Sequence, residues 1–235
     1  MLTNNWLIQQ LNEIDSTQNY AKNLNILDKQ IAILAKKQTA GYGQNGKQWK
    51  SSNENLNLSL ILPHDTHKPE ITIITSVILG RVILSLNSNL FLQHKWVNDI
   101  LIDQKKVAGI LIEQMQNKLI IGIGCNLKNH PWTTTNLPAT NLSKYGIDIT
   151  AVEFCNIFLQ EFTKLYNLWL TNGFAFFRKE WKSRAYKLNE LIYIQQQDSI
   201  ISGIFFDLDE NGKLILSQDK KLIGIMSGCL LKIES

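Results

Sequence analysis

A glycine-rich loop holds the first residues of this chain with an evident chemical use. Residues 41–46 read Gly-Tyr-Gly-Gln-Asn-Gly and match the G-x-G-x-x-G spacing of dinucleotide-binding loops. In those loops a helix follows at once, and its N-terminus receives the pyrophosphate. Here a polar stretch follows, and residues 56–62 then alternate between apolar and polar positions as a strand does. The loop is therefore predicted to join two strands, outside the Rossmann class and, without Gly-Lys-Ser/Thr, outside the P-loop class.

Lysines near this loop and later in the chain point to an anionic ligand. Glycines let backbone N–H groups approach an anion closely, and Lys47 and Lys50 add positive charge. Lys95 stands among apolar residues, where an ammonium group costs free energy unless it meets an anion. We expect that anion to be a ligand, and the alternative is a structural ion pair with Asp99 or Glu113. The loop is thus interpreted as a nucleotide-phosphate loop.

Composition narrows the class of protein. The 235 residues are 44% hydrophobic and 19% charged, with a net charge of +4 that suits anionic small molecules or an acidic protein partner. No apolar run reaches the roughly 20 residues that span a membrane, and the N-terminus does not resemble a signal peptide. No dense basic run is present, and too little chain precedes Ser16 for a helix-turn-helix, so we expect neither DNA nor membrane binding.

Cysteine and histidine spacing argues against a metal site. Cys125, Cys155 and Cys229 are scattered and odd in number, which predicts reduced thiols in a cytoplasmic protein. His64 and His67 lie between two prolines with no third ligand evident, and we interpret them as solvent-exposed. The spacing therefore predicts no metal site built from cysteine and histidine.

The elements that must position these residues follow from periodicity. Ser16 or Thr17 is predicted to cap a short helix that runs to about Leu24, and a hairpin turn is predicted at Lys105 and Lys106. Further helices are predicted over residues 71–86, 149–170 and 174–184. Strands are predicted over residues 6–15, 31–35, 56–62, 107–113 and 119–123. After residue 187 only short strands are predicted, over residues 191–194, 199–208, 214–217, 222–226 and 230–233. The prediction is an α+β domain at 1–187 with an all-β module at 188–235.

Four stretches in order carry a resemblance to a known family. They are residues 15–19 (Asp-Ser-Thr-Gln-Asn), 38–49, 95–100 (Lys-Trp-Val-Asn-Asp-Ile) with 105–113, and 122–126 (Gly-Ile-Gly-Cys-Asn). Together they resemble bacterial biotin–protein ligases, the biotin–[acetyl-CoA-carboxylase] ligases, over essentially the whole chain. The resemblance implies a mixed-sheet, class II synthetase-like catalytic domain at 1–187 and a small SH3-like β-barrel at 188–235. It also implies a ligase without the N-terminal DNA-binding domain, and a possible homodimer.

The resemblance implies a reaction in two steps. Biotin and ATP give biotinyl-5′-AMP and pyrophosphate with Mg²⁺, and a lysine of the biotin carboxyl carrier protein of acetyl-CoA carboxylase then takes the biotin. Neither step needs a protein nucleophile, but both need positioning, cationic stabilisation of phosphate charge and exclusion of water.

Residue roles follow from the same resemblance. Lys95 would be catalytic, countering charge near the biotin carboxylate and α-phosphate, and Asp99 would help to hold Mg²⁺. Biotin would be bound by Ser16, Thr17, Gln38, Gly41, Tyr42, Gly43, Lys95 and Gly109. ATP and the adenylate would be bound by Gly43, Gln44, Gly46, Lys47, Trp49 and Asn126. Lys106 would approach phosphate. The structural alternatives are helix capping for Ser16 and Thr17, a core position for Trp49, a turn for Asn126 and a solvated hairpin position for Lys106.

The chain departs from the family pattern in the loop. Tyr42, Gln44 and Lys47 stand where these ligases carry arginine, and Val97 stands where proline is common. A neutral glutamine lacks the charged, bidentate contact of arginine, so we expect weaker retention of the adenylate. Two rivals stay open: a lipoate or octanoate ligase or transferase with a longer apolar acyl tunnel, and a non-catalytic biotin or nucleotide sensor. Ser16, Thr17 and Gln38 favour biotin over lipoate.

Overall fold

The main body of the protein is a mixed β-sheet. The computed structural model describes residues 1–25, 29–50, 52–63, 68–115, 118–130, 137–197 and 199–231. Its first seven strands are β1 (Leu7–Ile14), β2 (Ile31–Gln38), β3 (Leu56–Pro63), β4 (Leu92–Lys95), β5 (Asp99–Ile102), β6 (Lys105–Met115) and β7 (Lys118–Cys125). They form one sheet in the order β1-β2-β3-β7-β6-β5-β4, in which β1 and β2 are parallel and the other pairs antiparallel. The predicted mixed-sheet α+β fold is confirmed.

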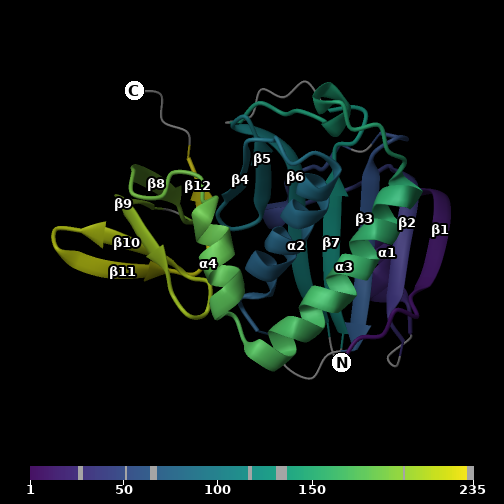
Figure 1. The fold of residues 1–235 in the computed structure, drawn as a ribbon, viewed down its shortest axis with the longest axis horizontal. Helices are drawn as coiled ribbons and strands as arrows, with labels where there is room; N and C mark the ends of the chain where they lie inside the picture. The colour runs from purple at the N-terminus through teal and green to yellow at the C-terminus, as the bar shows by residue number, and fades with distance from the viewer. Residues whose placement is uncertain are drawn as a thin grey trace.

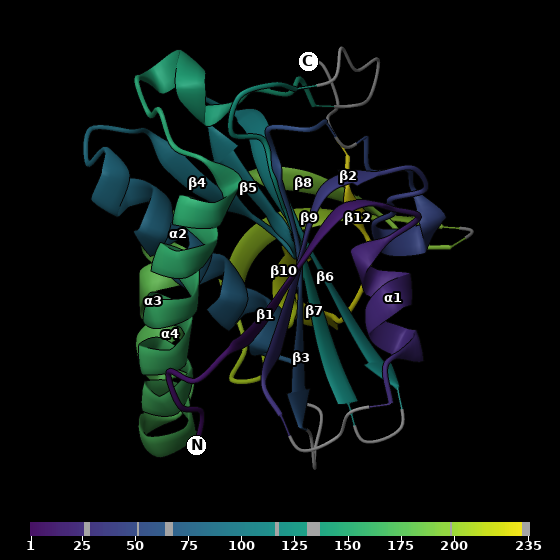
Figure 2. The same ribbon diagram turned by 90° about the vertical axis from the view of Figure 1, so that its right-hand side faces the viewer.

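Helices cover both faces of this sheet unequally. They are α1 (Thr17–Asn23), α2 (Ile71–Leu86), α3 (Ala151–Asn172) and α4 (Ala175–Ser183). Figure 2 shows α2, α3 and α4 on one face and α1 on the other. Helix α2 has the predicted bounds, and it is apolar nearly all round because it lies buried between the sheet and the other helices. None of the helices described is both long and apolar enough to cross a membrane.

Local capping sets the start of the longest helix. Thr150 accepts a hydrogen bond from the Glu153 backbone N–H at 3.2 Å, and the Glu153 carboxylate accepts one from the Thr150 N–H at 2.9 Å. This capping box satisfies two N–H groups that the helix itself leaves unpaired. The helix predicted from residue 149 therefore begins at Ala151.

The C-terminal part is a second sheet. Its strands are β8 (Leu191–Gln195), β9 (Ile200–Leu208), β10 (Leu214–Gln218), β11 (Lys221–Ile225) and β12 (Cys229–Leu230), in the antiparallel order β11-β10-β9-β8-β12. Figure 1 shows it beyond α4, at the β4 side of the main sheet. Phe205 packs in the same hydrophobic core as Trp181, and Asp207 pairs with Arg178 at 2.8 Å and Lys182 at 2.7 Å. The domain boundary at residues 187 and 188 stays a prediction.

Three smaller expectations have distinct outcomes. The hairpin turn lies at Asp103 and Gln104, which have φ of 48° and 60°, so the expected turn at the two following lysines is wrong. Those lysines instead begin β6, where Lys105 pairs with Ile102. All cysteines are free, as predicted. His64 and His67 lie outside the described residues.

Candidate functional site

Glycines on neighbouring strands form the floor of a pocket. Gly122 on β7 is aligned with Ser59 on β3 and Leu111 on β6, and Gly124 is aligned with Gly109 on β6. Because glycine has no side chain, these positions form the base of a hollow on the face of the sheet that carries α1, and Gln18, Trp49 and Lys106 reach over it. The hollow encloses about 150 Å³.

Most of the residues that the sequence singled out surround this hollow. The predicted site residues that line it are Ser16, Thr17, Gln38, Tyr42, Gly43, Gln44, Lys47, Trp49, Lys95 and Gly109. Three others, Gly41, Gly46 and Asn126, are absent from the lining described. The structure therefore gathers segments that are far apart in the sequence into one site.

A cluster of hydroxyl and amide groups lies at the start of α1. The Thr17 backbone N–H donates to Gln38 Oε1 at 2.8 Å, and Ser59 Oγ lies 2.8 Å from Thr17 Oγ1 and 2.9 Å from Gln18 Oε1. Ser16, Thr17, Gln18 and Ser59 are buried. Buried polar groups must be hydrogen-bonded, and this set can exchange donors and acceptors with a polar ring.

Ser16 serves the helix as well as the pocket. Its hydroxyl accepts hydrogen bonds from the N–H groups of Gln18 at 3.2 Å and Asn19 at 3.4 Å, which makes it the N-cap of α1. Ser16 therefore caps the helix and also lines the pocket, and its hydrogen bond to biotin stays a prediction.

The glycine loop joins β2 to β3, as predicted, and folds back on itself. The Trp49 N–H donates to Gly41 O at 2.9 Å, and the Gly43 N–H donates to Lys47 O at 2.8 Å. A Cβ on Gly41 would lie 2.9 Å from both Gln38 Nε2 and Trp49 O, so this glycine lets the two arms of the loop approach closely. Its place is therefore in the loop scaffold and not on the pocket surface.

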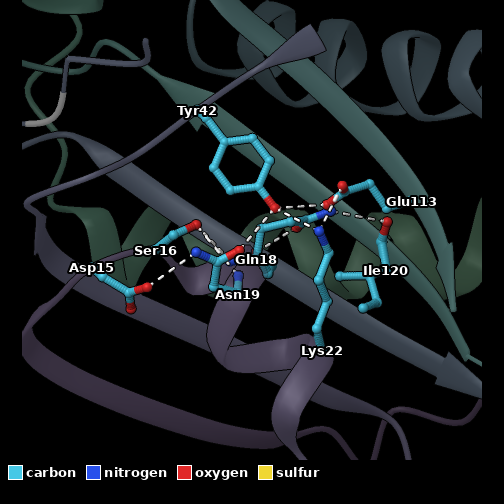
Figure 3. A network of polar contacts seen from close by, with 9 residues as sticks. Asp15, Ser16, Gln18, Asn19, Lys22, Tyr42, Glu113 and Ile120 are labelled. Atoms are coloured by element: carbon cyan, nitrogen blue, oxygen red, sulfur yellow. Dashed lines mark hydrogen bonds and ion pairs between the residues drawn. The ribbon is translucent and has the colours of Figure 1, made fainter. Parts of the chain in front are cut away.

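Tyr42 reaches across from the loop to the end of α1. Its phenol oxygen lies 2.8 Å from Lys22 Nζ, 3.0 Å from Glu113 Oε2 and 3.1 Å from Asn19 Oδ1 (Figure 3). Lys22 and Glu113 form an ion pair at 2.8 Å. Glu113, one of two carboxylates considered as a partner of Lys95, is thus engaged by Lys22 instead.

Trp49 lies against the backbone of β7. A Cβ on Gly124 would come within 2.3 Å of the indole, so only glycine permits this contact. The ammonium of Lys106 lies 5.6 Å from the indole ring centre, within cation–π range. Trp49 is half-buried and forms one wall of the pocket.

Lys95 is a buried ammonium group in a cluster of cations. Its side chain is 8% exposed and its Nζ lies 3.9 Å from Asp99 Oδ2, while Asp99 Oδ1 lies 2.6 Å from Lys106 Nζ. Burial lowers the pKa of Lys95, Asp99 opposes this shift, and the nearby Lys106 and Lys47 reinforce it. One carboxylate cannot neutralise three ammonium groups, so this end of the pocket suits an anion. Lys106 belongs to it and is not only a solvated hairpin lysine.

Asn126 lies beside the pocket. Its Nδ2 donates to Thr140 O at 3.0 Å, and its backbone N–H donates to Val107 O at 2.8 Å. Within the described ranges its buried Oδ1 has no hydrogen-bond partner. Both hydrogen bonds run to distant segments and neither closes a turn at Asn126, so its contact with a ligand stays a prediction.

Several residues that line the pocket were not predicted from the sequence. Gly228, Cys229 and Leu230 come from the second sheet, and Lys47 Nζ lies 3.6 Å from Cys229 Sγ. Gln18, Ser59 and Gly122 were also missed. A signal for the last was present, since two glycines alternate in a β-strand pattern at 122 and 124.

Carboxylates are scarce in the site. Asp99 is the one acidic residue of the lining described, and no group of three or more His, Cys, Asp or Glu in the described part could hold a metal ion. A single carboxylate beside bound phosphates is a common arrangement for Mg²⁺, which keeps several waters. The site fits a cation that arrives with a nucleotide.

Comparison with known proteins identifies the family. Residues 11–128 match the model of the biotin/lipoate A/B protein ligase family, and the chain belongs to this family. The chain is 30% identical over 232 residues to the bifunctional ligase/repressor BirA of Bacillus subtilis, covering 91% of this chain and 70% of that protein. It is 28% identical over 198 residues to the biotin–[acetyl-CoA-carboxylase] ligase of Paracoccus denitrificans, covering 78% and 82%.

A solved structure shares the whole fold. The biotin protein ligase from Aquifex aeolicus, in complex with biotin and ATP, has a TM-score of 0.85 with 25% identity, covering 95% of this chain and 97% of that one. The similarity extends to the C-terminal sheet, because the matched region covers nearly all of both chains.

Proposed function

We propose that this protein is an ATP-dependent biotin–protein ligase. It would join biotin to AMP and then transfer biotin to a lysine of the biotin carboxyl carrier protein of acetyl-CoA carboxylase, in the cytoplasm. The observation that carries the proposal is the buried Lys95, which lies in the same pocket as a hydroxyl and amide cluster and a group of cations. The relatives named for biotin and the related structure with biotin and ATP support it.

The first step needs charge stabilisation more than a protein nucleophile. A carboxylate oxygen of biotin attacks the α-phosphorus of ATP, a new P–O bond forms, and the bond to the β-phosphate breaks to release pyrophosphate. Lys95 would counter the negative charge that gathers on the α-phosphate. Asp99 would help to hold Mg²⁺, whose charge would be supplied to the phosphates of ATP.

The acid would be oriented by the polar cluster. The buried Ser16, Thr17, Gln18 and Ser59, with Gln38, would hydrogen-bond the ureido ring, since a buried polar ring needs partners. In the second step the amine of the acceptor lysine attacks the acyl carbon, an amide forms and AMP leaves. A site closed by the loop would keep water from the mixed anhydride.

Pyrophosphate release tests the proposal. Protein, ATP and Mg²⁺ are mixed with biotin or with lipoate, using wild type, Lys95→Ala and the control Lys37→Ala, whose lysine forms an exposed ion pair with Glu13. Biotin-dependent release that falls roughly 100-fold or more in Lys95→Ala alone is expected. If pyrophosphate is released with lipoate and not with biotin, the protein would instead be assigned as a lipoate ligase. No release from folded protein would favour a non-catalytic sensor.

A further inference from the structure

Tyr42 connects three elements at one end of the pocket. It belongs to the glycine loop, and its phenol oxygen meets Lys22 at the end of α1 and Glu113 on β6, at 2.8 Å and 3.0 Å. In Figure 3 the ring extends from the loop to the helix and strand below it. A single side chain thus links the loop to the helix and to the sheet.

The ion pair lies behind the pocket and not in it. Gly122 lines the pocket, whereas Ile120, two residues back on the same face of β7, is aligned with Glu113 in the next row across the sheet. Tyr42 is among the lining residues described, and neither Lys22 nor Glu113 is. The ring is therefore the end wall, and the charged pair supports it from outside.

These contacts are charge-assisted and partly shielded from water. The side chains of Lys22 and Glu113 are 28% and 26% exposed. Burial favours a lower pKa for Lys22, but its hydrogen bonds to Glu113 and Tyr42 outweigh burial and raise the pKa above its ordinary value. Burial also raises the pKa of Tyr42, so near neutral pH the phenol keeps its proton beside a charged pair. Hydrogen bonds with a charged partner are about twice as strong as neutral ones.

The tip of the loop has weaker support. Asn45, Gly46 and Lys47 are exposed, and the tip is held mainly by the loop's own backbone bond from Gly43 N–H to Lys47 O. An exposed segment with few outside contacts opens easily. The contacts of Tyr42 are therefore the main side-chain anchor at the proximal end of the loop.

We infer that Tyr42, Lys22 and Glu113 form a latch that holds the glycine loop over the pocket before any ligand binds. Tyr42 is then a positioning residue for the acid substrate. A loop that is already in its binding form removes the ordering cost from binding, and affinity rises with the fraction of molecules in that form. The identity of the acid as biotin rests on the proposed function, but the latch itself does not.

Two measurements test the latch. Hydrogen exchange of residues 39–49 in ligand-free protein reports loop opening, and calorimetry with biotin alone reports affinity. Tyr42→Phe keeps the ring and removes the hydroxyl, Lys22→Met removes the cation, Lys22→Arg keeps it, and Lys37→Met removes a lysine from an exposed pair. We expect exchange about five- to tenfold faster in Tyr42→Phe and Lys22→Met, with biotin binding weakened by the smaller factor by which the closed fraction of the loop falls. Lys22→Arg and Lys37→Met should resemble wild type.

Steady-state kinetics separates positioning from chemistry. In both latch variants the KM for biotin should rise, while kcat at saturating biotin should stay within about twofold of wild type. Unchanged loop exchange in Tyr42→Phe and in Lys22→Met would overturn the inference, as would a loss of kcat with an unchanged KM. If wild type does not bind biotin but loop exchange responds as expected, the latch stands and the proposed substrate is wrong. Thermal melting of each variant, with Glu113→Gln as a further one, separates a local effect from unfolding.

Discussion

Gly124 and Trp49 fit so closely that a Cβ atom on the glycine would lie 2.3 Å from the indole Cε2. The indole of Trp49 can therefore pack against β7 only because the strand has no side chain at residue 124. Lys106 lies 5.6 Å from the ring centre, so the same contact also places a cation. Trp49, which forms this wall of the pocket, can therefore lie there only because residue 124 is glycine.

Replacing this glycine tests that relationship. Gly124→Ala should displace Trp49 and either destabilise the fold by about 1–3 kcal/mol or raise the KM for ATP roughly tenfold. Steady-state kinetics and chemical denaturation measure both effects. In a Trp49→Ala background the glycine replacement should add little, because its partner has gone. Gly224→Ala is the control, since its Cβ would meet ordinary contacts of 3.6 Å. Equal behaviour of the two alanine variants would contradict the prediction.

Removing the charge of Asp99 should change the pH profile of pyrophosphate release. Burial lowers the pKa of Lys95, and Asp99 opposes that shift, so Asp99→Asn should lower the pKa further. If the reaction needs the ammonium form, the alkaline limb of the profile should then move to lower pH. Rates measured from pH 6 to 10 in wild type and Asp99→Asn check this. A limb that stays fixed or moves upward would show that Lys95 is not the titrating group.

Adding a charge at Gln44 should strengthen retention of the adenylate. Gln44 lines the pocket, and arginine there could make a bidentate, charged contact to phosphate. Gln44→Arg is expected to slow dissociation of biotinyl-AMP several-fold, since a charged hydrogen bond exceeds a neutral one by on the order of 1 kcal/mol. Single-turnover release of labelled adenylate measures the rate. An unchanged or faster release would count against this contact.

The buried His94 should make stability depend on acid pH. It is enclosed, its Nδ1 lies 2.8 Å from Ser76 Oγ, and burial together with the Arg184 charge lowers its pKa to about 3. In the unfolded chain His94 binds a proton near pH 6.5, so its full contribution to the free energy of unfolding is present above pH 6.5. It is lost as pH falls toward 3, by up to about 1.4 kcal/mol per pH unit.

Urea denaturation between pH 7 and 4 tests this sign. His94→Gln, which keeps a partner for Ser76, should be less stable at pH 7 and lose less stability on acidification than wild type. His130, whose ring is far less buried, supplies the control through His130→Gln. Parallel curves for wild type and His94→Gln would exclude His94 as the source of the acid sensitivity.

Local patterns were enough to predict much of the fold. Helix α2 has the bounds that its apolar spacing indicated, and the loop between β2 and β3 was predicted because no helix-forming pattern follows its glycines. Such features depend on neighbours in the sequence. The turn at Asp103 and Gln104 was misplaced by two residues, because a pair of lysines resembles a polar turn although they pair in β6.

The site could be predicted only where a motif marked it. Lys95 and Gln38 were found, but Ser59 was not, since its hydroxyl enters the site through the register of β3 against β7. Cys229 was missed because β12, which pairs with β8 within the second sheet, reaches the pocket of the first sheet. Local sequence pattern does not encode how the two sheets meet. The support of Tyr42 by Lys22 likewise depends on how α1 lies over the sheet.

The residues that shape the pocket are largely different from those that form the hydrophobic core. The pocket floor includes glycines on two adjacent strands, whereas the hydrophobic core lies largely on the other face of the sheet, around α2. Substitutions of the polar side chains that lie over this floor, such as Gln18, could therefore reshape the cavity and leave the core untouched. Paired with substrate analogues trimmed by one group, such variants would give orthogonal enzyme–substrate pairs on an unchanged scaffold.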